Sequence, residues 1–443
     1  MRQRGGRLTV LFTPLDGWGH INANHGFAEA LRDRGHRVVF AVDAKFEGKL
    51  KPFGFEEEIH RPKPKASDTE AIENGGPVVV DIYAELVRKY ADVFKLTPIE
   101  IIDRFVATAF GSMLDTSRER EEQYRQIIAK VNPDVIVVDS YIGSPTLTHS
   151  GKPWVWLYSA APHLCVNSSK VPPGWSGLPL NGNREEWTQF KQQFDSIFTD
   201  LYNRTNKWYK FKVKPSLDEQ HMAFLHPVSP YLNIYMYPKE LDYEETHPLP
   251  EKFRRVDGFV RTTDDTFEIP EQLVDKPGKL IFLSMGSFGC ANMELMTRIT
   301  GILAKSEHRY IVSKGPLHDK YELPDNMWGS QFLPQTAVLP LVDLVITHGG
   351  NNTVTETFFY GKPMLVLPLF GDQFDNAQRL EETGLGLRLN PFNCTDEELL
   401  SAVDQLVNDS VLSETMASIG ERIRKSNDKE MVAKLIEQIA INK

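Results

Sequence analysis

Residues 344–361 have the pattern of a buried strand, a glycine turn and a helix, and this unit restricts the folds that the chain can adopt. The apolar run 344–347 ends in His348 and two glycines, and Gly361 ends the helical segment that follows. The first amides of a helix lack intrahelical partners and lie at the positive end of its dipole. This turn therefore predicts a phosphate site. The same residues also fit an ordinary strand-to-helix turn that polar side chains cap.

Short apolar strands alternate with helices along both halves of the chain, which predicts an α/β protein with two doubly wound, Rossmann-like domains. At 443 residues, the chain is too long for one ordinary core. The predicted parts are a first domain at 1–240, a linker at 241–278, a second domain at 279–425 and a last helix at 426–443. In such sheets, ligands bind at the carboxyl ends of the strands, where the strand order reverses.

Two polar side chains in the first half follow predicted strands. His20 lies in a loop after the strand at 8–13, and Asp139 ends the apolar run at 133–140. Because the carboxyl ends of parallel strands share one edge, we expect the two side chains to meet. A carboxylate can then orient an imidazole that accepts a proton near neutral pH. Without His20, Asp139 would be interpreted as a turn residue.

The first strand, glycine loop and helix also fit a dinucleotide-binding unit. Gly17 and Gly19 would form the glycine loop, and Asp43 would bind the ribose. We disfavour this alternative because Asn22 occupies the third glycine position and His20 would project into the crevice.

The stretch 332–373 resembles the donor-binding signature of the UDP-glycosyltransferases, a large inverting sugar-transfer family with the two-domain GT-B fold. The matches follow the family order, and they are Phe332, Gln335, His348, Gly350, Asn352, Thr353, Glu356, Asp372 and Gln373. The opening of the chain resembles the same family at Pro14, Gly17, His20 and 34–36. Several matches in one order are more specific than any one of them.

The resemblance implies a role for each matching residue. Phe332 would stack on uracil, while Gln335 and Glu356 would hold the ribose hydroxyls. The residues assigned to the diphosphate are Ser287, His348, Gly350, Asn352 and Thr353, and those assigned to the sugar hydroxyls are Asp372 and Gln373. His20 would be the catalytic base, and Asp139 would orient it. In the family the last helix crosses back onto the first domain, and we expect the same here.

Three departures from the family pattern bear on the donor. Phe332 replaces Trp, Asn351 stands where the plant enzymes carry Trp, and the spacing from Gln335 to His348 is shorter by two residues. These departures affect the choice of sugar and not the class of donor. By resemblance, Gln373 favours glucose, with N-acetylglucosamine, glucuronic acid and galactose as alternatives.

Aromatic residues recur at helical spacing in 185–214 and bear on the acceptor. They are Trp187, Phe190, Phe194, Phe198, Tyr202, Trp208 and Tyr209. Such a stripe is typical of a helix packed in a core, and it could also form one wall of an apolar acceptor cleft. We expect a small lipophilic acceptor with a hydroxyl group, such as a flavonoid, a phenol or another xenobiotic. The stretch 61–76 is predicted as an exposed loop.

Charge and composition limit the partners and the compartment. A formal charge of −10 and a pI near 5.7 disfavour nucleic-acid and anionic-membrane surfaces, which need clustered positive charge. Three distant cysteines without metal-ligand spacing indicate a reducing compartment. The sequence shows no secretory signal and no apolar run of roughly 20 residues, so we expect a cytoplasmic monomer without a membrane span. We also expect a reaction that needs no metal and no cofactor beyond the UDP-sugar.

Two other functions share the same donor site. A nucleotide-sugar epimerase would bind UDP in a similar way and would need no separate acceptor. A sensor would retain the UDP-sugar without turnover, although such a protein would have no use for the base His20 and its partner Asp139.

Overall fold

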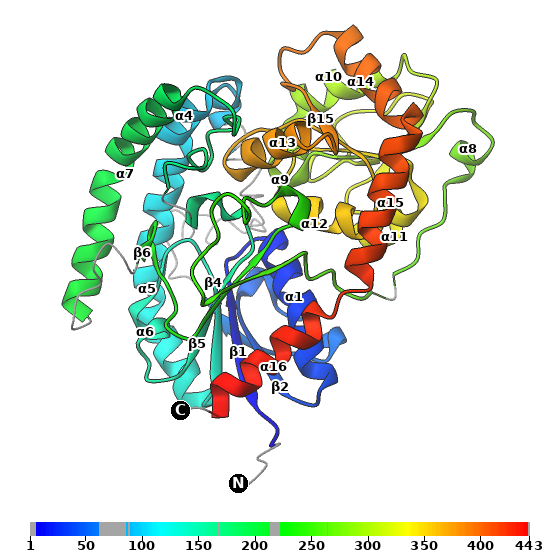
Figure 1. Cartoon of the computed structure of the whole chain (residues 1–443). Coiled ribbons are helices and arrows are strands. Elements are labelled where there is room, and N and C mark those ends of the chain that lie inside the picture. The colour runs from blue at the N-terminus through cyan, green and yellow to red at the C-terminus, as the bar shows by residue number, and fades with distance from the viewer. Residues whose placement is uncertain are drawn as a thin grey trace, which may run out of the picture.

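The computed structural model describes residues 6–61, 86, 89–165, 168–212, 222–263 and 265–441. These residues form two α/β domains, each with a parallel sheet packed against helices (Figure 1). The predicted pair of doubly wound domains is confirmed. The exposed loop predicted at 61–76 lies outside the described residues from position 62 onward.

The first sheet is parallel throughout, and its strand order decides where the polar strand ends meet. Its strands are β1 (Thr9–Pro14), β2 (Arg37–Asp43), β3 (Glu56–His60), β4 (Val135–Asp139), β5 (Trp154–Tyr158), β8 (Leu232–Met236) and β9 (Phe253–Val256). The order β3-β2-β1-β4-β5-β8-β9 reverses direction between β1 and β4. Pro14 pairs with Asp139 there, at the carboxyl ends of both strands.

The linker predicted at 241–278 is wrong for its first part. β9 (Phe253–Val256) lies inside that range and pairs in parallel with β8, so the first domain extends at least to Val256. Only Phe253 and Val256 of its four residues are apolar, and both are buried. A strand this short has too little periodicity to be recognised from the sequence.

Helices and turns of the first domain connect its strands. They are α1 (Trp18–Asp33), α4 (Pro98–Ile101), α5 (Ala107–Val131), α6 (Pro145–Thr148) and α7 (Arg184–Lys212), a small antiparallel pair β6 (Met222–Ala223) and β7 (His226–Pro227), 3-10 turns at Ala44–Phe46, Lys51–Phe53, Val93–Lys95, Pro162–Cys165 and Lys239–Leu241, and a π turn at Ile102–Val106. The aromatic stripe lies on α7, where Phe194, Phe198 and Tyr209 are buried in a cluster with Phe110 of α5. These three residues of the stripe are therefore packed in a core, and the alternative of an acceptor wall stays a prediction.

The second sheet repeats this plan. Its strands are β10 (Leu280–Ser284), β11 (Arg309–Ser313), β12 (Met327–Ser330), β13 (Leu344–Thr347), β14 (Met364–Val366) and β15 (Gly386–Arg388), in the parallel order β12-β11-β10-β13-β14-β15. Its helices are α8 (Glu271–Val274), α9 (Gly286–Cys290), α10 (Met293–Leu303), α11 (Gln335–Val338), α12 (Asn351–Tyr360), α13 (Asp372–Glu382), α14 (Asp396–Asn408) and α15 (Ser410–Arg424), with a 3-10 turn at Leu339–Leu341. The strand order reverses between β10 and β13, where Ser284 pairs with Thr347.

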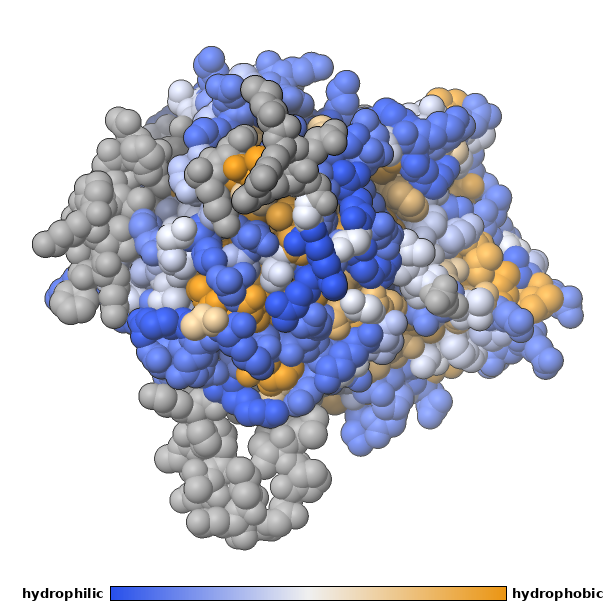
Figure 2. All heavy atoms as spheres, turned by 90° about the horizontal axis from the view of Figure 1, so that it is seen from below, coloured by the Kyte–Doolittle hydropathy of each residue, from blue (hydrophilic) through white to orange (hydrophobic). Residues whose placement is uncertain are grey.

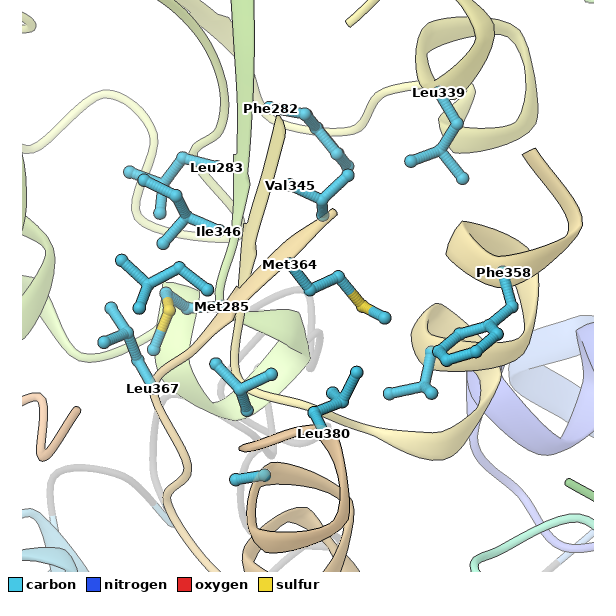
Figure 3. Close-up of a cluster of buried hydrophobic side chains, with 14 of the residues drawn as sticks. Phe282, Leu283, Met285, Leu339, Val345, Ile346, Phe358, Met364, Leu367 and Leu380 are labelled. Atoms are coloured by element: carbon cyan, nitrogen blue, oxygen red, sulfur yellow. The ribbon is translucent and has the colours of Figure 1, made fainter. Parts of the chain in front are cut away.

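Apolar side chains of the second sheet hold α12 and α13 in place. Val345 and Met364 of the sheet are fully buried, as are Phe358 of α12 and Leu380 of α13. Figure 3 shows Met364 between the strands and Phe358, with Leu380 below it. Burying such side chains stabilises the packing by about 1.5–3 kcal/mol each. The N-termini of both helices are thereby fixed at the carboxyl edge of the sheet.

The last helix, α16 (Asp428–Ile441), lies against the first domain, although the chain reaches it from the second (Figure 1). Val432, Ala433 and Ile436 belong to the same buried cluster as Leu31 of α1. Arg34 also contacts Glu437 at 2.8 Å. The two domains are therefore joined by two crossings of the chain.

Polar residues cover most of the face seen in Figure 2, where hydrophobic residues gather in small separate areas. Exposed large apolar side chains include Tyr231, Phe332 and Val411, which lie far apart in the chain. Single exposed apolar residues are ordinary on folded domains. None of the helices in the described part of the chain is long and apolar enough to cross a bilayer.

The packing of α16 predicts a strong effect of Ile436→Ala on stability. Ile436 is fully buried, so its truncation leaves a cavity and should lower the free energy of unfolding by about 2–5 kcal/mol. Ile441 in the same helix is 61% exposed, and Ile441→Ala should change it by less than about 0.5 kcal/mol. Urea denaturation measures both values, and equal effects would contradict the docking of α16.

Candidate active site

The carboxyl edges of the two sheets face each other across the domain interface. A Cβ atom added to Gly19, in the first turn of α1, would lie 3.9 Å from Cβ of Asn352, in the first turn of α12. Two helix N-termini therefore meet at the interface, and each offers unpaired amides and the positive end of its dipole. This arrangement suits an anionic ligand such as a diphosphate.

His20 and Asp139 are in contact, as their positions after β1 and at the end of β4 indicate. His20 Nδ1 lies 3.0 Å from Asp139 Oδ2, and the two side chains are 20% and 3% exposed. Because an ionised carboxylate can only accept hydrogen bonds, we assign the proton of the neutral imidazole to Nδ1. Nε2 is then free to accept a proton from a hydroxyl group.

Ser159 and Asn24, which the sequence analysis did not single out, complete this network. The Ser159 hydroxyl donates to Asp139 at 2.9 and 3.0 Å and lies 2.8 Å from His20 Nδ1. The Asn24 amide donates to Asp139 at 2.7 Å. Both positions carried a signal, since Ser159 directly follows a buried strand and Asn24 lies one helical turn after His20.

The surroundings of His20 make it a stronger base than a free imidazole. Burial lowers the pKa of His20, but the Asp139 carboxylate outweighs this effect, and Asp372 acts in the same direction. The resulting pKa lies above the ordinary value of 6.5. The ring can therefore hold a proton taken from a hydroxyl group, and its basic form is lost as the pH falls through this pKa.

An ion-pair cluster lies beside His20 at the same sheet edge. Arg120 contacts Asp16 at 2.6 Å and Asp43 at 3.2 Å. Among the described residues, Asp16, Asp43 and His60 are close enough together to hold a metal ion. Burial lowers the pKa of His60 to about 3, and Arg120 adds to this effect. Since Arg120 already balances the two carboxylates, we assign the cluster to holding the turn before α1, the helix that carries His20.

His348 lies at the carboxyl end of β13, with its ring between two glycines. A Cβ atom added to Gly286 or Gly350 would lie 2.5 Å from the imidazole. Burial lowers the pKa of His348 to about 4, so the ring is neutral at pH 7. It can donate a hydrogen bond to a diphosphate but cannot neutralise its charge. That charge must be met by the positive end of α12.

The other residues assigned to a diphosphate lie at the same sheet edge. Asn352 and Thr353 are in the first turn of α12, which begins at Asn351 as predicted. Ser287 is exposed in the short helix α9. The structure thus brings all residues assigned to this role to the carboxyl ends of β10 and β13.

Glu356 is surrounded by hydrogen-bond donors. It accepts from Gln335 at 2.6 Å, from Asn352 at 3.0 Å and from Arg261, and its side chain is 3% exposed. These donors occupy most of the acceptor sites of the Glu356 carboxylate. The sequence analysis missed Arg261 because it lies in the predicted linker. A cavity of about 280 Å³, lined in part by Tyr360, adjoins Arg261.

Phe332, assigned to the uracil ring, is 68% exposed. It lies three residues before Gln335, whose amide contacts Glu356. A planar base can reach such a ring from solvent. The stacking role of Phe332 stays a prediction.

Asp372 and Gln373 begin α13, close to the first domain. Asp372 accepts from the backbone amide of Ala161 at 3.1 Å. Burial raises the pKa of Asp372 to about 6, and the charge of His20 opposes this rise. Gln373 is buried, and its carbonyl oxygen accepts from two backbone amides of the preceding turn at 2.9 and 3.2 Å. Only the NH2 group of Gln373 is left for a sugar.

Residues 233–427 match the family model described as UDP-glucoronosyl and UDP-glucosyl transferase. The second half of the chain thus carries a domain of the UDP-glycosyltransferase type. The matched region contains the second sheet and every residue from Ser287 to Gln373 that the resemblance assigned to the donor. The resemblance predicted from the sequence is confirmed.

Curated relatives cover part of the chain. It is 25% identical over 260 residues to the sterol 3-beta-glucosyltransferase of Vanderwaltozyma polyspora, a match that spans 53% of this chain and 20% of the yeast protein. It is 26% identical over 223 residues to human UDP-glucuronosyltransferase 1A9, with 49% of this chain and 37% of the human protein covered. The matched regions are thus well under two thirds of the relatives' own lengths.

Solved structures share the fold of the whole chain. The glycotransferase of kitacinnamycin superposes with a TM-score of 0.70 at 21% identity, covering 98% of this chain and all of that one (100%). CalG4, the calicheamicin glycosyltransferase, gives a TM-score of 0.64 at 19% identity, with 98% of each chain covered. The predicted GT-B fold of two Rossmann-like domains is confirmed.

Replacing Asp139 by Asn should lower the pKa of His20, because the carboxylate raises this pKa in the wild type. NMR titration of the imidazole signals measures the midpoint in both proteins. We expect a wild-type midpoint above 6.5 and a lower one in Asp139→Asn. An unchanged midpoint would contradict the role of the Asp139 carboxylate in raising the pKa of His20.

Gly286→Ala should weaken the binding of UDP. Gly286 has a φ of +65°, and its added Cβ would lie 2.5 Å from the His348 ring, so the substitution must displace that ring. Strain of about 1–3 kcal/mol corresponds to roughly a 5- to 150-fold loss of affinity, measured by calorimetry. Gly301→Ala is the matched control, because its Cβ would meet open space on α10. Equal affinities in both variants would remove His348 from the UDP site.

Proposed function

We propose that this protein transfers a hexose from a UDP-sugar to a hydroxyl group of a small lipophilic acceptor and inverts the anomeric centre. One observation carries the proposal: the His20 and Asp139 pair lies across the interface from the N-termini of α12 and α13. A proton acceptor, an anion site and sugar-binding groups therefore converge on one place, which is what glycosyl transfer to a hydroxyl requires.

The reaction follows from these positions. His20 Nε2 takes the acceptor proton as the acceptor oxygen attacks the anomeric carbon. The bond from that carbon to the diphosphate oxygen breaks on the opposite face, and UDP leaves with the electron pair. Asp139 stabilises the imidazolium through Nδ1. The amides at the start of α12, with Asn352 and Thr353, stabilise the charge on UDP, so the proposed reaction needs no metal ion.

A neutral sugar fits the donor end better than an acidic one. Asp372 has a pKa of about 6, so it is mostly ionised at pH 7 and would repel the carboxylate of glucuronic acid. Its carboxylate can accept from two sugar hydroxyls, and the NH2 group of Gln373 can donate to another. UDP-glucose is therefore our first choice of donor, ahead of UDP-N-acetylglucosamine, UDP-galactose and UDP-glucuronic acid.

Aromatic side chains near His20 favour a lipophilic acceptor. The ring of Tyr141 lies 5.8 Å from the His20 ring and 5.3 Å from Phe110, and Trp175 lies 5.6 Å from Phe110. A hydroxyl group at His20 thus meets apolar rings on one side. The sterol glucosyltransferases among the relatives support this class of acceptor, and phenols, flavonoids and other xenobiotics belong to it.

The release of UDP from UDP-sugars tests the proposal. With a panel of phenols and sterols and with EDTA present, we expect release that depends on the acceptor. His20→Ala should lower it by about 100- to 10,000-fold while UDP still binds, because only the base is lost. His247→Ala, between β8 and β9, should retain full activity as a matched histidine control.

Three outcomes would contradict the proposal in different ways. UDP release without an acceptor would favour hydrolysis, and conversion of the UDP-sugar into its epimer without net UDP release would favour an epimerase. UDP-sugar binding with no turnover on any acceptor would favour a sensor. Release that EDTA abolishes would show that a metal ion takes part.

A further inference from the structure

Asn351 joins the donor-binding helix to the first domain. It is the first residue of α12 and is 5% exposed. Its side-chain amide donates to the backbone oxygen of Ser159 at 2.9 Å and to that of Met236 at 2.8 Å. These carbonyl groups lie at the ends of β5 and β8, so one amide bridges two strand ends of the opposite domain. An Asp or a Trp at this position could not supply two N–H donors at the same place.

Ser159 continues this connection to the catalytic pair. Its backbone oxygen accepts from Asn351, while its hydroxyl donates to Asp139 and lies 2.8 Å from His20 Nδ1. Two residues later, the amide of Ala161 donates to Asp372. The segment 159–161 is therefore tied to the second domain at both ends, and it contacts the base through one side chain.

We infer that Asn351 and Ser159 are positioning residues. Their hydrogen bonds hold the His20 and Asp139 pair at a fixed position relative to the donor-binding helix α12. The inference rests on the proposed function, because it concerns the alignment of the base with the donor sugar. His20 and the donor residues belong to different sheets, so their alignment depends on contacts at the interface. A misplacement of about 1 Å can cost roughly 100-fold in rate.

Substitutions at both positions test the inference through kcat and KM. Asn351→Ala and Ser159→Ala should each lower kcat by about 10- to 100-fold, since the base loses its alignment. The KM for UDP-glucose and the Kd for UDP should change by less than about threefold, because neither side chain is assigned to the donor. Ser159→Thr keeps a hydroxyl group and should recover most of the lost kcat.

Asn233→Ala is the matched control for stability. Asn233 is 1% exposed in β8, and its side chain bonds only within the first domain, to the backbone of Ser229. This variant should lower the thermal midpoint about as much as Asn351→Ala but leave kcat unchanged. Equal losses of kcat in both variants would show that Asn351 acts through stability alone, which overturns the inference.

The double variant separates one connection from two independent effects. If Asn351 acts through Ser159, the loss of kcat in Asn351→Ala/Ser159→Ala should be close to the larger single loss. A loss equal to the product of the single losses would overturn the inference.

Amide hydrogen exchange tests the positioning role independently of the proposed function, because the measurement needs bound UDP and no catalytic turnover. UDP binding should slow amide exchange in the peptide 153–161 of the wild type and have much less effect in Asn351→Ala. Equal protection in both proteins would overturn the positioning role, whatever the activity. Failure of the wild type to transfer sugar, with protection that depends on Asn351, would instead contradict the proposed function alone.

Discussion

The register between β1 and β4 is the constraint on which the site depends. Parallel hydrogen bonding places Pro14 opposite Asp139, so the turn that leads into α1 and its residue His20 begins beside the carboxylate. Side chains alternate between the two faces of a strand, and a slip of one residue would turn Asp139 to the other face of the sheet. The same reversal of strand order between β10 and β13 places Ser284 opposite Thr347, which sets the start of α12.

Burial at the interface shifts the pKa values of His348, His20 and Asp372, and these shifts set which of the groups are charged. Burial lowers the pKa of His348 to about 4, so the ring beside the anion site is neutral. Burial lowers the pKa of His20 too, but Asp139 raises it above 6.5 and keeps the ring basic. Burial raises the pKa of Asp372 to about 6. The strength of the base thus comes from a hydrogen-bonded carboxylate and not from exposure to solvent.

Much of the site could be predicted from local patterns. His20 and Asp139 each follow an apolar strand, and the helix after His348 begins at Asn351 as its glycine turn indicates. The residues that were missed act through contacts distant in the chain. Arg261 reaches Glu356 from a stretch without periodicity, which also hid β9. Ser159 directly follows β5, a strand that was recognised from the sequence. Its hydrogen bonds to Asp139 form only because β5 pairs with β4 in the sheet.

The sequence by itself determined the class of fold and the positions where each domain presents its polar strand ends, because apolar periodicity and glycine turns act over a few residues. Only the tertiary structure decided how the two domains meet. The amide of Asn351 finds its carbonyl partners 115 and 192 residues away in the chain. No local pattern encodes such a pair, since these hydrogen bonds form only when two different sheets bring their edges together.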